Sequence, residues 1–328
     1  MARKWSYWTK NKLQILGDYV PAFNKASARS SERLYLDLMA GQPENEERYT
    51  GKVIDGSPRR VLAADPGFTQ HVFFELPANA ARLKAVLDIE FPGKEFEVIP
   101  GDSNLEIDAA LKALEPIKWA PAFAFIDQQA AEVWWETLVK IARFKGVRAR
   151  TKPELWLLMS PTMTVKGVSR RGTNSAAFRE RVTRLYGTRN WLNIQEARET
   201  SVITADQYRE EMTNFMRFRL AEALGYKYTN RIPMRMENGT TIYDMVFASD
   251  HYVGDKIMSH LYAKAAEREP AMQREARRLA KMDREHKAGT EGLFEIPASA
   301  EPEVSGAILW RPEPYWNPAE REWWTERD

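Results

Sequence analysis

Four acidic residues lie near the ends of successive apolar runs in the first half of the chain: Asp37, Glu75, Asp102 and Asp127. Ligands of open α/β sheets bind beyond the carboxyl ends of the strands, so carboxylates at these positions could contact one ligand together. Gly41 follows the first run and would let the backbone approach that ligand closely. An acid after the second strand can accept hydrogen bonds from both ribose hydroxyls, and one after the third can accept from an adenine amino group. The pattern predicts a nucleoside-binding site.

S-adenosylmethionine is the cofactor that this pattern favours. The chain lacks the strict Gly-x-Gly-x-x-Gly motif that binds the pyrophosphate of dinucleotides. Asp127 is then the candidate catalytic residue, because it would face the methyl acceptor. Any one of the four acids could instead be a helix N-cap. The predicted cofactor-binding residues form two groups. We expect methionine and ribose to contact Asp37, Gly41 and Glu75, and adenine to contact Asp102 and Asn104.

A basic segment could supply the contacts to a nucleic acid. Between residues 140 and 190 there are thirteen Lys and Arg against two Asp and Glu, although the whole chain carries a net charge of only +2. Lys166, Arg170 and Arg171 lie there in a Gly- and Ser-containing stretch that predicts a mobile loop, and we expect them to bind phosphate. The alternative is a solvated face, or a surface for the acidic remainder of this chain or of another protein.

A second candidate anion contact is Ser57, in the segment Asp55-Gly-Ser-Pro58. Ser57 is predicted to be the N-cap and Pro58 the first helical residue. The free amides at that helix start could hold an anion, or the motif could be a helix cap alone.

Several classes of site are excluded or disfavoured by composition. The chain has no cysteine, which excludes disulfides, thiolate metal sites and a cysteine nucleophile. Its four histidines are not spaced like metal ligands, so we expect no metal site. His251, beside Asp250, could be a general base or could form a structural hydrogen bond. No apolar run is long enough to span a membrane and no secretory signal is visible, so we expect a cytoplasmic protein.

The elements that must position these residues follow from the apolar patterning. Five short apolar runs recur about every 30 residues, with helical sequence between them, which is typical of parallel strands with helical crossovers. Two later runs flank Asn238-Gly239, a strong hairpin signal. The sequence therefore predicts an α/β, Rossmann-like fold with a mostly parallel seven-stranded sheet and an antiparallel C-terminal hairpin. The predicted strands are residues 34–40, 71–76, 95–99, 121–127 and 154–159, followed by the hairpin strands 232–237 and 241–249.

Three parts of the chain are expected. Residues 1–30 hold a helix that packs on the core, and residues 31–262 form the α/β domain, with the basic insertion at about 160–200. Residues 263–288 are predicted to form a charged helix, and the tail that follows is rich in proline and aromatic residues. The tryptophans of this tail could dock on the body of the protein or on a partner.

Several motifs together resemble those of the three-Cys-motif partner (TcmP) proteins, which are related to class I methyltransferases. The similarity runs from Lys10 to about Ala263, some three-quarters of the chain. Its best markers are Asp55-Gly-Ser-Pro58 and Phe247-Ala-Ser-Asp-His251. The other matching segments include Lys12-Leu-Gln-Ile-Leu16, Tyr35-Leu-Asp-Leu-Met-Ala-Gly41, Phe73-Phe-Glu75, Gly101-Asp102, Ala124-Phe-Ile-Asp127 and Leu155-Trp-Leu-Leu158.

The resemblance implies a class I methyltransferase fold and a partner protein with three clustered cysteines. Two loops depart from the family pattern. Gly41-Gln-Pro43 stands where the family has Gly-Pro-Gly, and Asp127-Gln-Gln-Ala130 stands where it has Asp-Pro, an aromatic residue and Gly. Both departures fall where cofactor and acceptor would bind. Two functions therefore stay open: a methyltransferase-like protein that acts on or binds nucleic acid, and a catalytically silent partner subunit with the same fold.

Overall fold

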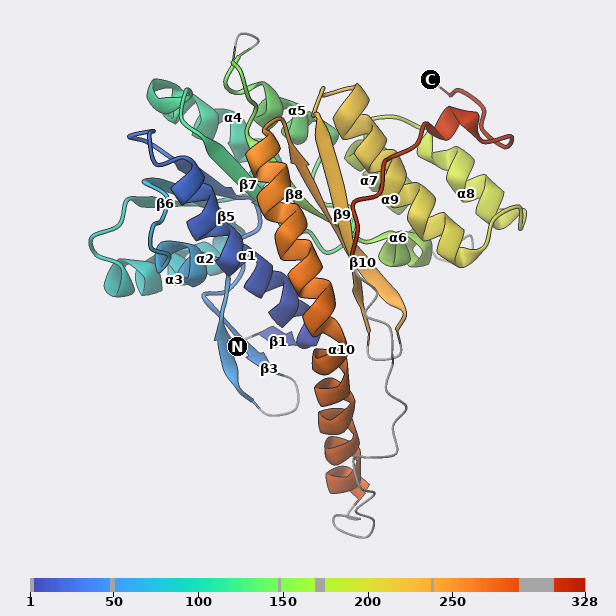
Figure 1. Cartoon of the computed structure of the whole chain (residues 1–328), viewed down its shortest axis with the longest axis horizontal. Helices are drawn as coiled ribbons and strands as arrows, with labels where there is room; N and C mark the ends of the chain where they lie inside the picture. The colour runs from blue at the N-terminus through green and yellow to red at the C-terminus, as the bar shows by residue number, and fades with distance from the viewer. Residues whose placement is uncertain are drawn as a thin grey trace.

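A seven-stranded sheet forms the centre of the molecule, whose computed structural model describes residues 3–47, 51–146, 149–168, 175–236, 239–288 and 310–327. Its strands are β2 (Leu34–Asp37), β5 (Gln70–Glu75), β6 (Phe96–Pro100), β7 (Ala122–Ile126), β8 (Glu154–Met159), β9 (Tyr228–Arg235) and β10 (Thr241–Ser249). They are arranged in the order β6-β5-β2-β7-β8-β10-β9 (Figure 1). The first five are parallel, and β10 is antiparallel to both of its neighbours. The predicted Rossmann-like α/β fold with its antiparallel hairpin is confirmed.

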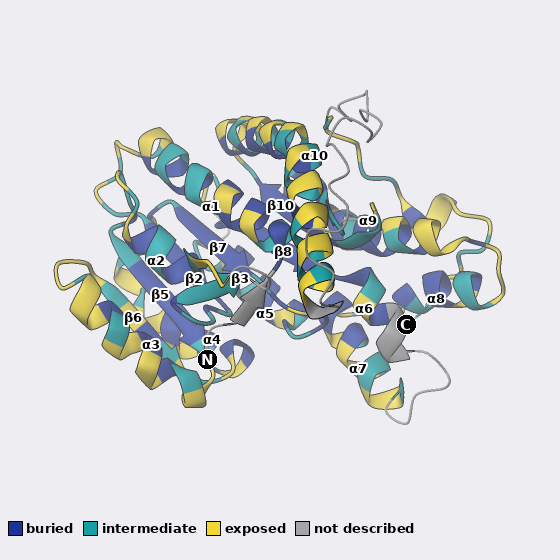
Figure 2. Ribbon diagram, turned by 90° about the horizontal axis from the view of Figure 1, so that it is seen from below, coloured by how far each residue is buried: buried dark blue, intermediate teal, exposed yellow. Residues whose placement is uncertain are grey.

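Helices cover both faces of this sheet. They are α1 (Tyr7–Ala26), α2 (Ser57–Leu62), α3 (Pro77–Glu90), α4 (Ser103–Ala113), α5 (Trp135–Arg143), α6 (Pro161–Val168), α7 (Ser175–Tyr186), α8 (Trp191–Glu199), α9 (Ala205–Glu222) and α10 (Tyr252–Ala288), with short 3₁₀ turns at Glu115–Ile117 and Pro318–Glu320. Because side chains alternate along a strand, Phe123 and Phe125 of β7 pack toward α1, α2, α3 and α10. Ala124 and Ile126 pack toward the other layer, formed by α4, α5, α7, α8 and α9. Figure 2 shows the buried strands between these layers.

The N-terminal segment is tied to the loop that follows β2. A second, three-stranded sheet joins β1 (Arg3–Trp5), β3 (Glu44–Glu47) and β4 (Val53–Asp55). β1 pairs in parallel with β3, and β3 is antiparallel to β4. The sequence did not indicate this sheet. Its effect is to hold the start of α1 beside the carboxyl edge of the large sheet.

Helices α6 and α10 differ from the elements predicted for these parts of the chain. The stretch containing Lys166 was expected to be a loop, but residues 161–168 form α6, and residues 169–174 lie outside the described residues. The charged helix begins at Tyr252 and not at residue 263, so α10 crosses the predicted domain boundary. Its N-terminal half runs beside α1 over the sheet, and its C-terminal half extends beyond the body (Figure 1). The predicted capping box of α9, formed by Thr204 and Gln207, is confirmed.

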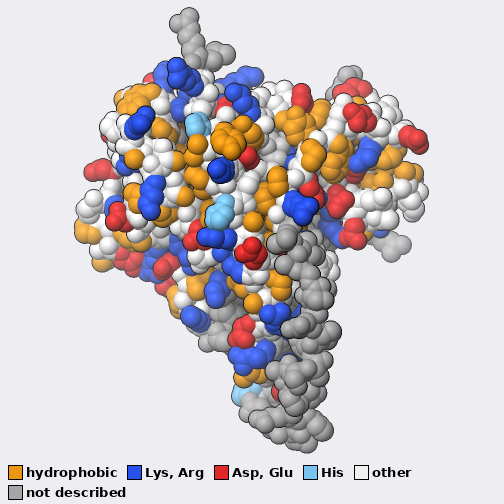
Figure 3. Space-filling model, viewed as in Figure 1, with side chains coloured by type: hydrophobic (Ala, Val, Ile, Leu, Met, Phe, Trp, Pro, Cys, Tyr) orange, Lys and Arg blue, Asp and Glu red, His pale blue; other side chains and the backbone are white. Residues whose placement is uncertain are grey.

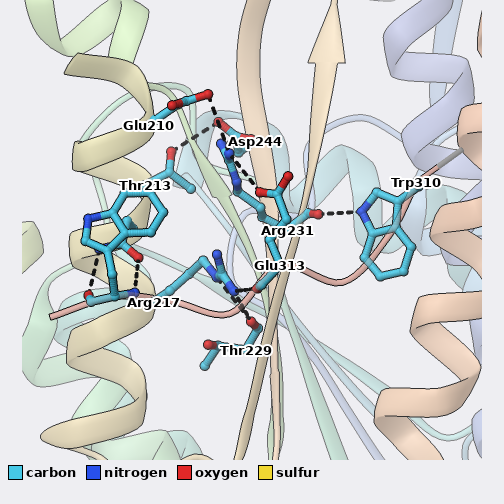
Figure 4. Close-up of polar contacts among 10 residues, drawn as sticks. Glu210, Thr213, Arg217, Thr229, Arg231, Asp244, Trp310 and Glu313 are labelled. Atoms are coloured by element: carbon cyan, nitrogen blue, oxygen red, sulfur yellow. Dashed lines mark hydrogen bonds and ion pairs between the residues drawn. The ribbon is translucent and has the colours of Figure 1, made fainter. Parts of the chain in front are cut away.

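The aromatic tail docks on the body of the protein. The Trp310 indole donates to the Arg231 carbonyl on β9 at 2.8 Å, and the buried Arg217 of α9 donates to the carbonyls of Thr229 and Glu313 (Figure 4). Further along, the side chains of Trp323 and Trp324 pack against the hydrophobic core beneath α9. Of the two alternatives for this tail, docking on its own chain is the one observed over residues 310–327.

Candidate functional site

A cavity of about 310 Å³ lies at the carboxyl edge of the large sheet, between β2 and β7. The strand order reverses there: the chain moves outward from β2 to β5 and β6, and then returns to the other side of β2 with β7. Such a reversal point is where open α/β sheets bind ligands, because the connections diverge and leave a crevice. Met39–Gln42 after β2 and Asp127–Gln129 after β7 form two of its walls, and Ser6, Trp8, Lys12, Ser160 and Tyr243 contribute to the others.

Asp127, the candidate catalytic residue, lines this cavity and is paired with Lys12. The Lys12 ammonium lies 2.5 Å from both carboxylate oxygens of Asp127. The side chain of Lys12 is 6% exposed and that of Asp127 is 26% exposed. The ring of Tyr243 lies 5.6 Å from the same ammonium. A nearly buried cation therefore shares the position predicted for the methyl acceptor.

Gly41 and Glu75 are in direct contact. The Gly41 amide donates to Glu75 Oε2 at 2.6 Å, and Glu75 Oε1 accepts from the Leu76 amide and from Asn79. Gly41 has a φ of +70°, a left-handed conformation that favours glycine. The two predicted cofactor contacts thus bind each other, and Gly41 lines the cavity whereas Glu75 does not.

Asp37 is fully buried beneath the cavity and does not line it. It accepts hydrogen bonds from the Ser57 hydroxyl at 2.7 Å, from Tyr35 at 3.1 Å and from the Met39 amide at 3.3 Å. Burial raises the pKa of Asp37 to about 7, although these hydrogen bonds oppose the shift. Asp37 therefore fixes the loop after β2, and any contact with a ligand is made through the residues that it holds.

Ser57 lines the cavity, but its predicted role as a helix N-cap is wrong. Gly56 occupies the N-cap position of α2, and the Ser57 hydroxyl donates to Asp37. Gly56 fits there because a side-chain carbon at that position would lie 2.4 Å from the Gln42 carbonyl oxygen. Close packing against the loop at Gln42 therefore accounts for the glycine at position 56.

Asp102 and Asn104 lie at the start of α4, outside the cavity. Asp102 is the N-cap: its Oδ1 accepts from the amide and the side chain of Asn104. Asn104 is buried and also bonds Glu132, Trp134 and Thr137, so it fastens α4 to the segment that leads into α5. Of the two predicted adenine contacts, Asn104 is engaged in hydrogen bonds that hold the fold together. No hydrogen bond within the described residues reaches Oδ2 of Asp102.

Gln128 stands where the three-Cys-motif partner pattern, which the sequence resembles, has proline. Its side chain is fully buried, donates to the Leu158 carbonyl at 3.0 Å and accepts from the amides of Glu132 and Val133. Gln129 is exposed and lines the cavity. The loop after β7 is thus held by a glutamine side chain.

The basic segment is partly neutralised by acids from elsewhere in the chain. Lys140 pairs with Asp108, Lys152 with Asp250, and Arg179 with Glu199. On the face drawn in Figure 3, Lys and Arg side chains alternate with Asp and Glu. Lys166 lies on α6, but its side chain is outside the described residues, as are Arg170 and Arg171 entirely.

His251 and Asp250 do not act as a pair. Asp250 binds Lys152 at 2.9 Å, and His251 Nδ1 accepts from the Val253 amide at the start of α10. This is the structural hydrogen bond that was one of the two alternatives for His251.

Sequence reasoning missed Lys12, Trp8 and Tyr243 as parts of the cavity wall. Lys12 did carry a signal, since it stands four residues before Leu16 on the apolar face of α1, where a lysine needs a buried partner. Nothing local to Lys12 identifies Asp127 as that partner.

Comparison of the chain with protein-family models and with curated proteins finds no match. Among the helices of the described residues, none is long and apolar enough to cross a membrane. The same residues contain no group of three or more histidine or acidic side chains suited to holding a metal ion.

Proposed function

We propose that this chain is a methyltransferase-like protein that binds S-adenosylmethionine at the carboxyl edge of its large sheet. The observation that carries the proposal is the cavity at the point where the strand order reverses, bounded by the Gly41 loop and by Asp127. The expectation of a three-Cys-motif partner protein rests on the resemblance of the sequence motifs, and a nucleic-acid substrate on the basic segment.

The residues along this edge have unused capacity for a nucleoside. Glu75 accepts three hydrogen bonds, and a carboxylate offers about four acceptor positions, which leaves one for a ribose hydroxyl. Oδ2 of Asp102 is available to an adenine amino group. Leu76 and Leu105 follow Glu75 and Asp102 closely, and they are 58% and 64% exposed. Exposed leucines beside these acids suit the faces of a purine ring.

The ion pair in the cavity limits which acceptor fits. An amine would compete with the Lys12 ammonium for Asp127. A hydroxyl can donate to Asp127 and accept from Lys12 at the same time. When bound, the cofactor would supply the electrophilic methyl group, and the pair would orient the hydroxyl oxygen toward it. RNA carries such a hydroxyl on every ribose, so RNA is the nucleic acid that we favour as substrate.

Calorimetric titration of the purified protein with S-adenosylmethionine tests the proposal. We expect micromolar binding, weakened about tenfold or more in Glu75→Ala because a hydrogen bond to a charged group is lost. Asp108→Ala is the matched control, because Asp108 is an exposed carboxylate on α4 that pairs with Lys140 at the surface. Absence of binding to the folded wild-type protein would contradict the cofactor assignment.

Transfer of a labelled methyl group to RNA and to DNA of the same sequence tests the acceptor. The proposal expects label in RNA only, and loss of that label in Lys12→Met and Asp127→Asn. Label in DNA bases would favour an amine acceptor and contradict the role given to the ion pair.

A catalytically silent partner subunit is the second candidate. The observation that favours it is the occupied acceptor position, where Lys12 satisfies both oxygens of Asp127. Under this hypothesis the protein binds its partner, but neither RNA nor DNA is methylated even when cofactor and partner are both present.

A further inference from the structure

A second cavity, of about 260 Å³, lies at the opposite edge of the large sheet. Pro121 and Ala122 at the start of β7 line it, together with Glu154 at the start of β8. Helix α1 contributes to both cavities: its N-terminal part lines the first, and Tyr19, Phe23 and Ala26 line the second. None of the described residues lines both cavities, so this one is separate from the proposed cofactor site.

One side of the cavity is apolar. Phe23, near the end of α1, lines the cavity and is 6% exposed. Ile257 and Val253 come from the first turns of α10. A carbon skeleton placed against Phe23, Pro121 and Ile257 would remove apolar surface from water on both sides of the contact.

The carboxyl group at the base of the cavity already has its partners. Glu154 Oε2 accepts from the Tyr19 hydroxyl, and Oε1 accepts from the Ser249 hydroxyl at 2.7 Å. Gly254 of α10 lies directly against it, because a side-chain carbon there would be 2.0 Å from Glu154 Oε1. Burial raises the pKa of Glu154 to about 7, so the group is partly protonated near neutral pH. Glu154 therefore repels an incoming anion less than an exposed glutamate would.

The two lysines of the cavity differ in their pairing. Lys152 binds Asp250 at 2.9 Å and the Gly225 carbonyl at 3.0 Å. Lys145 lines the cavity, and the described part of the chain offers it neither a hydrogen bond nor an ion pair. Burial lowers the pKa of Lys145, opposed by the charges of Glu154 and Asp250. Lys145 is a partly desolvated ammonium that a bound anion would stabilise.

We propose that this cavity binds a small organic carboxylate, whose carboxylate group pairs with the Lys145 ammonium and whose carbon skeleton packs on Phe23, Pro121 and Ile257. The volume suits a molecule of the size of phenylacetate or hexanoate. An amine would have to displace the hydroxyl donors from Glu154 and would lie beside Lys145, so the arrangement selects against it.

Three probes with one carbon skeleton test the charge preference: phenylacetate, phenylacetamide and phenethylamine. Calorimetry and saturation-transfer NMR on the full chain should show phenylacetate binding about tenfold or more tightly than the neutral amide, as a charge-assisted hydrogen bond implies. Equal binding of acid and amide would overturn the proposal. Tightest binding of the amine would also overturn it and would identify Glu154 as the anchor.

Two variants test the position. Lys145→Met keeps the apolar stem and removes the ammonium, so phenylacetate should bind about tenfold more weakly. Lys140→Met is its matched control, because Lys140 is a half-buried lysine on α5 that pairs with Asp108 away from this cavity. Ala26→Phe narrows the mouth from an exposed position that tolerates a larger side chain, and it should abolish binding while the unfolding midpoint is retained. Unchanged binding in Lys145→Met or in Ala26→Phe would show that the ligand lies elsewhere.

Discussion

The ammonium of Lys12 and the carboxylate of Asp127, which are 115 positions apart in the chain, meet at 2.5 Å in the cavity between β2 and β7. This contact attaches the N-terminal helix to the carboxyl edge of the sheet. It also gives the site a cation that the apolar runs and strand ends alone do not provide. Its contribution to the free energy of unfolding and its effect on methyl transfer can be measured separately.

Lys12→Met should destabilise the fold by about 2 kcal/mol, because it leaves a mostly buried carboxylate without its cation. In Lys12→Met/Asp127→Asn the loss should be smaller than the sum of the two single losses by about 1 kcal/mol, since the paired residues are energetically coupled. Urea unfolding of the wild type, the two single variants and the double variant measures both the single losses of stability and the coupling. Lys10→Met, an exposed position on the same helix, should change stability by less than about 0.5 kcal/mol. Additive single losses would contradict the coupling.

Much of the fold could be predicted because its signals are local. A strand that is buried on both faces is a continuous apolar run, as at 154–159, and the pair Thr204 and Gln207 is a capping box within four residues. The contacts of the site were less accessible. Lys12 with Asp127, and Gly41 with Glu75, depend on how helices and loops pack after the chain has folded. Sequence spacing carries no record of such distant pairings.

The same limit explains why acids at strand ends took different positions. Asp37 ends β2 and Asp127 follows the neighbouring β7, yet Asp37 is buried under a loop and Asp127 lines the cavity. The difference comes from Ser57, which the loop after β2 brings over Asp37. Residue type at a strand end predicted the edge correctly, but it could not predict which carboxylate another side chain would cover.

Gln128→Pro, in the loop after β7, should destabilise the protein by about 2 kcal/mol. The substitution removes the three hydrogen bonds that the fully buried Gln128 side chain makes with the amides of Glu132 and Val133 and with the Leu158 carbonyl. Gln129→Phe, at the exposed neighbour, should be nearly neutral. Thermal and urea unfolding of both variants decides the matter, and equal stability of the two would mean that the Gln128 contacts contribute little.

Gly254→Ala should destabilise the fold by about 2 kcal/mol, because the added carbon would lie 2.0 Å from a carboxylate oxygen that cannot move without breaking its hydrogen bonds. Gly17→Ala on α1 is the matched control. The carbon added there meets nothing closer than 3.7 Å, so helix propensity should make this variant neutral or slightly more stable. If both variants were equally stable, Glu154 would not be held against α10 as described.

Trp324→Ala should cost about 2 kcal/mol and expose the tail to proteases. Its ring packs edge-on against Phe215 of α9 at 5.4 Å between centroids, and it covers part of the core. Trp119→Ala, at a side chain that is 53% exposed, should leave the unfolding midpoint unchanged. A tail that remained protected in Trp324→Ala would place most of the docking energy in the contacts of Arg217 and Trp310 (Figure 4).

Glu154 should make the protein less stable as the pH rises from about 4.5 to about 7. Burial raises its pKa from 4.5 to about 7 in the folded protein, so the folded state binds more protons than the unfolded state across this range. Stability then falls with rising pH, by about 3 kcal/mol for a shift of this size. Lys145 and Asp250 act on Glu154 in opposite directions and do not reverse the sign. Asp37 contributes a fall of the same sense, because burial also raises its pKa to about 7.

Glu154→Gln removes the contribution of Glu154 to this pH-dependent loss of stability, leaves that of Asp37, and keeps the shape of the side chain. Its amide can still accept one hydroxyl proton, and it can donate to the other hydroxyl oxygen. The variant should therefore lose less stability than the wild type between pH 4.5 and pH 7, as measured by urea unfolding at a series of pH values. Asp108→Asn, which changes an exposed carboxylate, should follow the wild-type curve. Parallel curves for Glu154→Gln and the wild type would mean that Glu154 is ionised in the folded protein well below neutral pH, and that the second cavity presents a full negative charge.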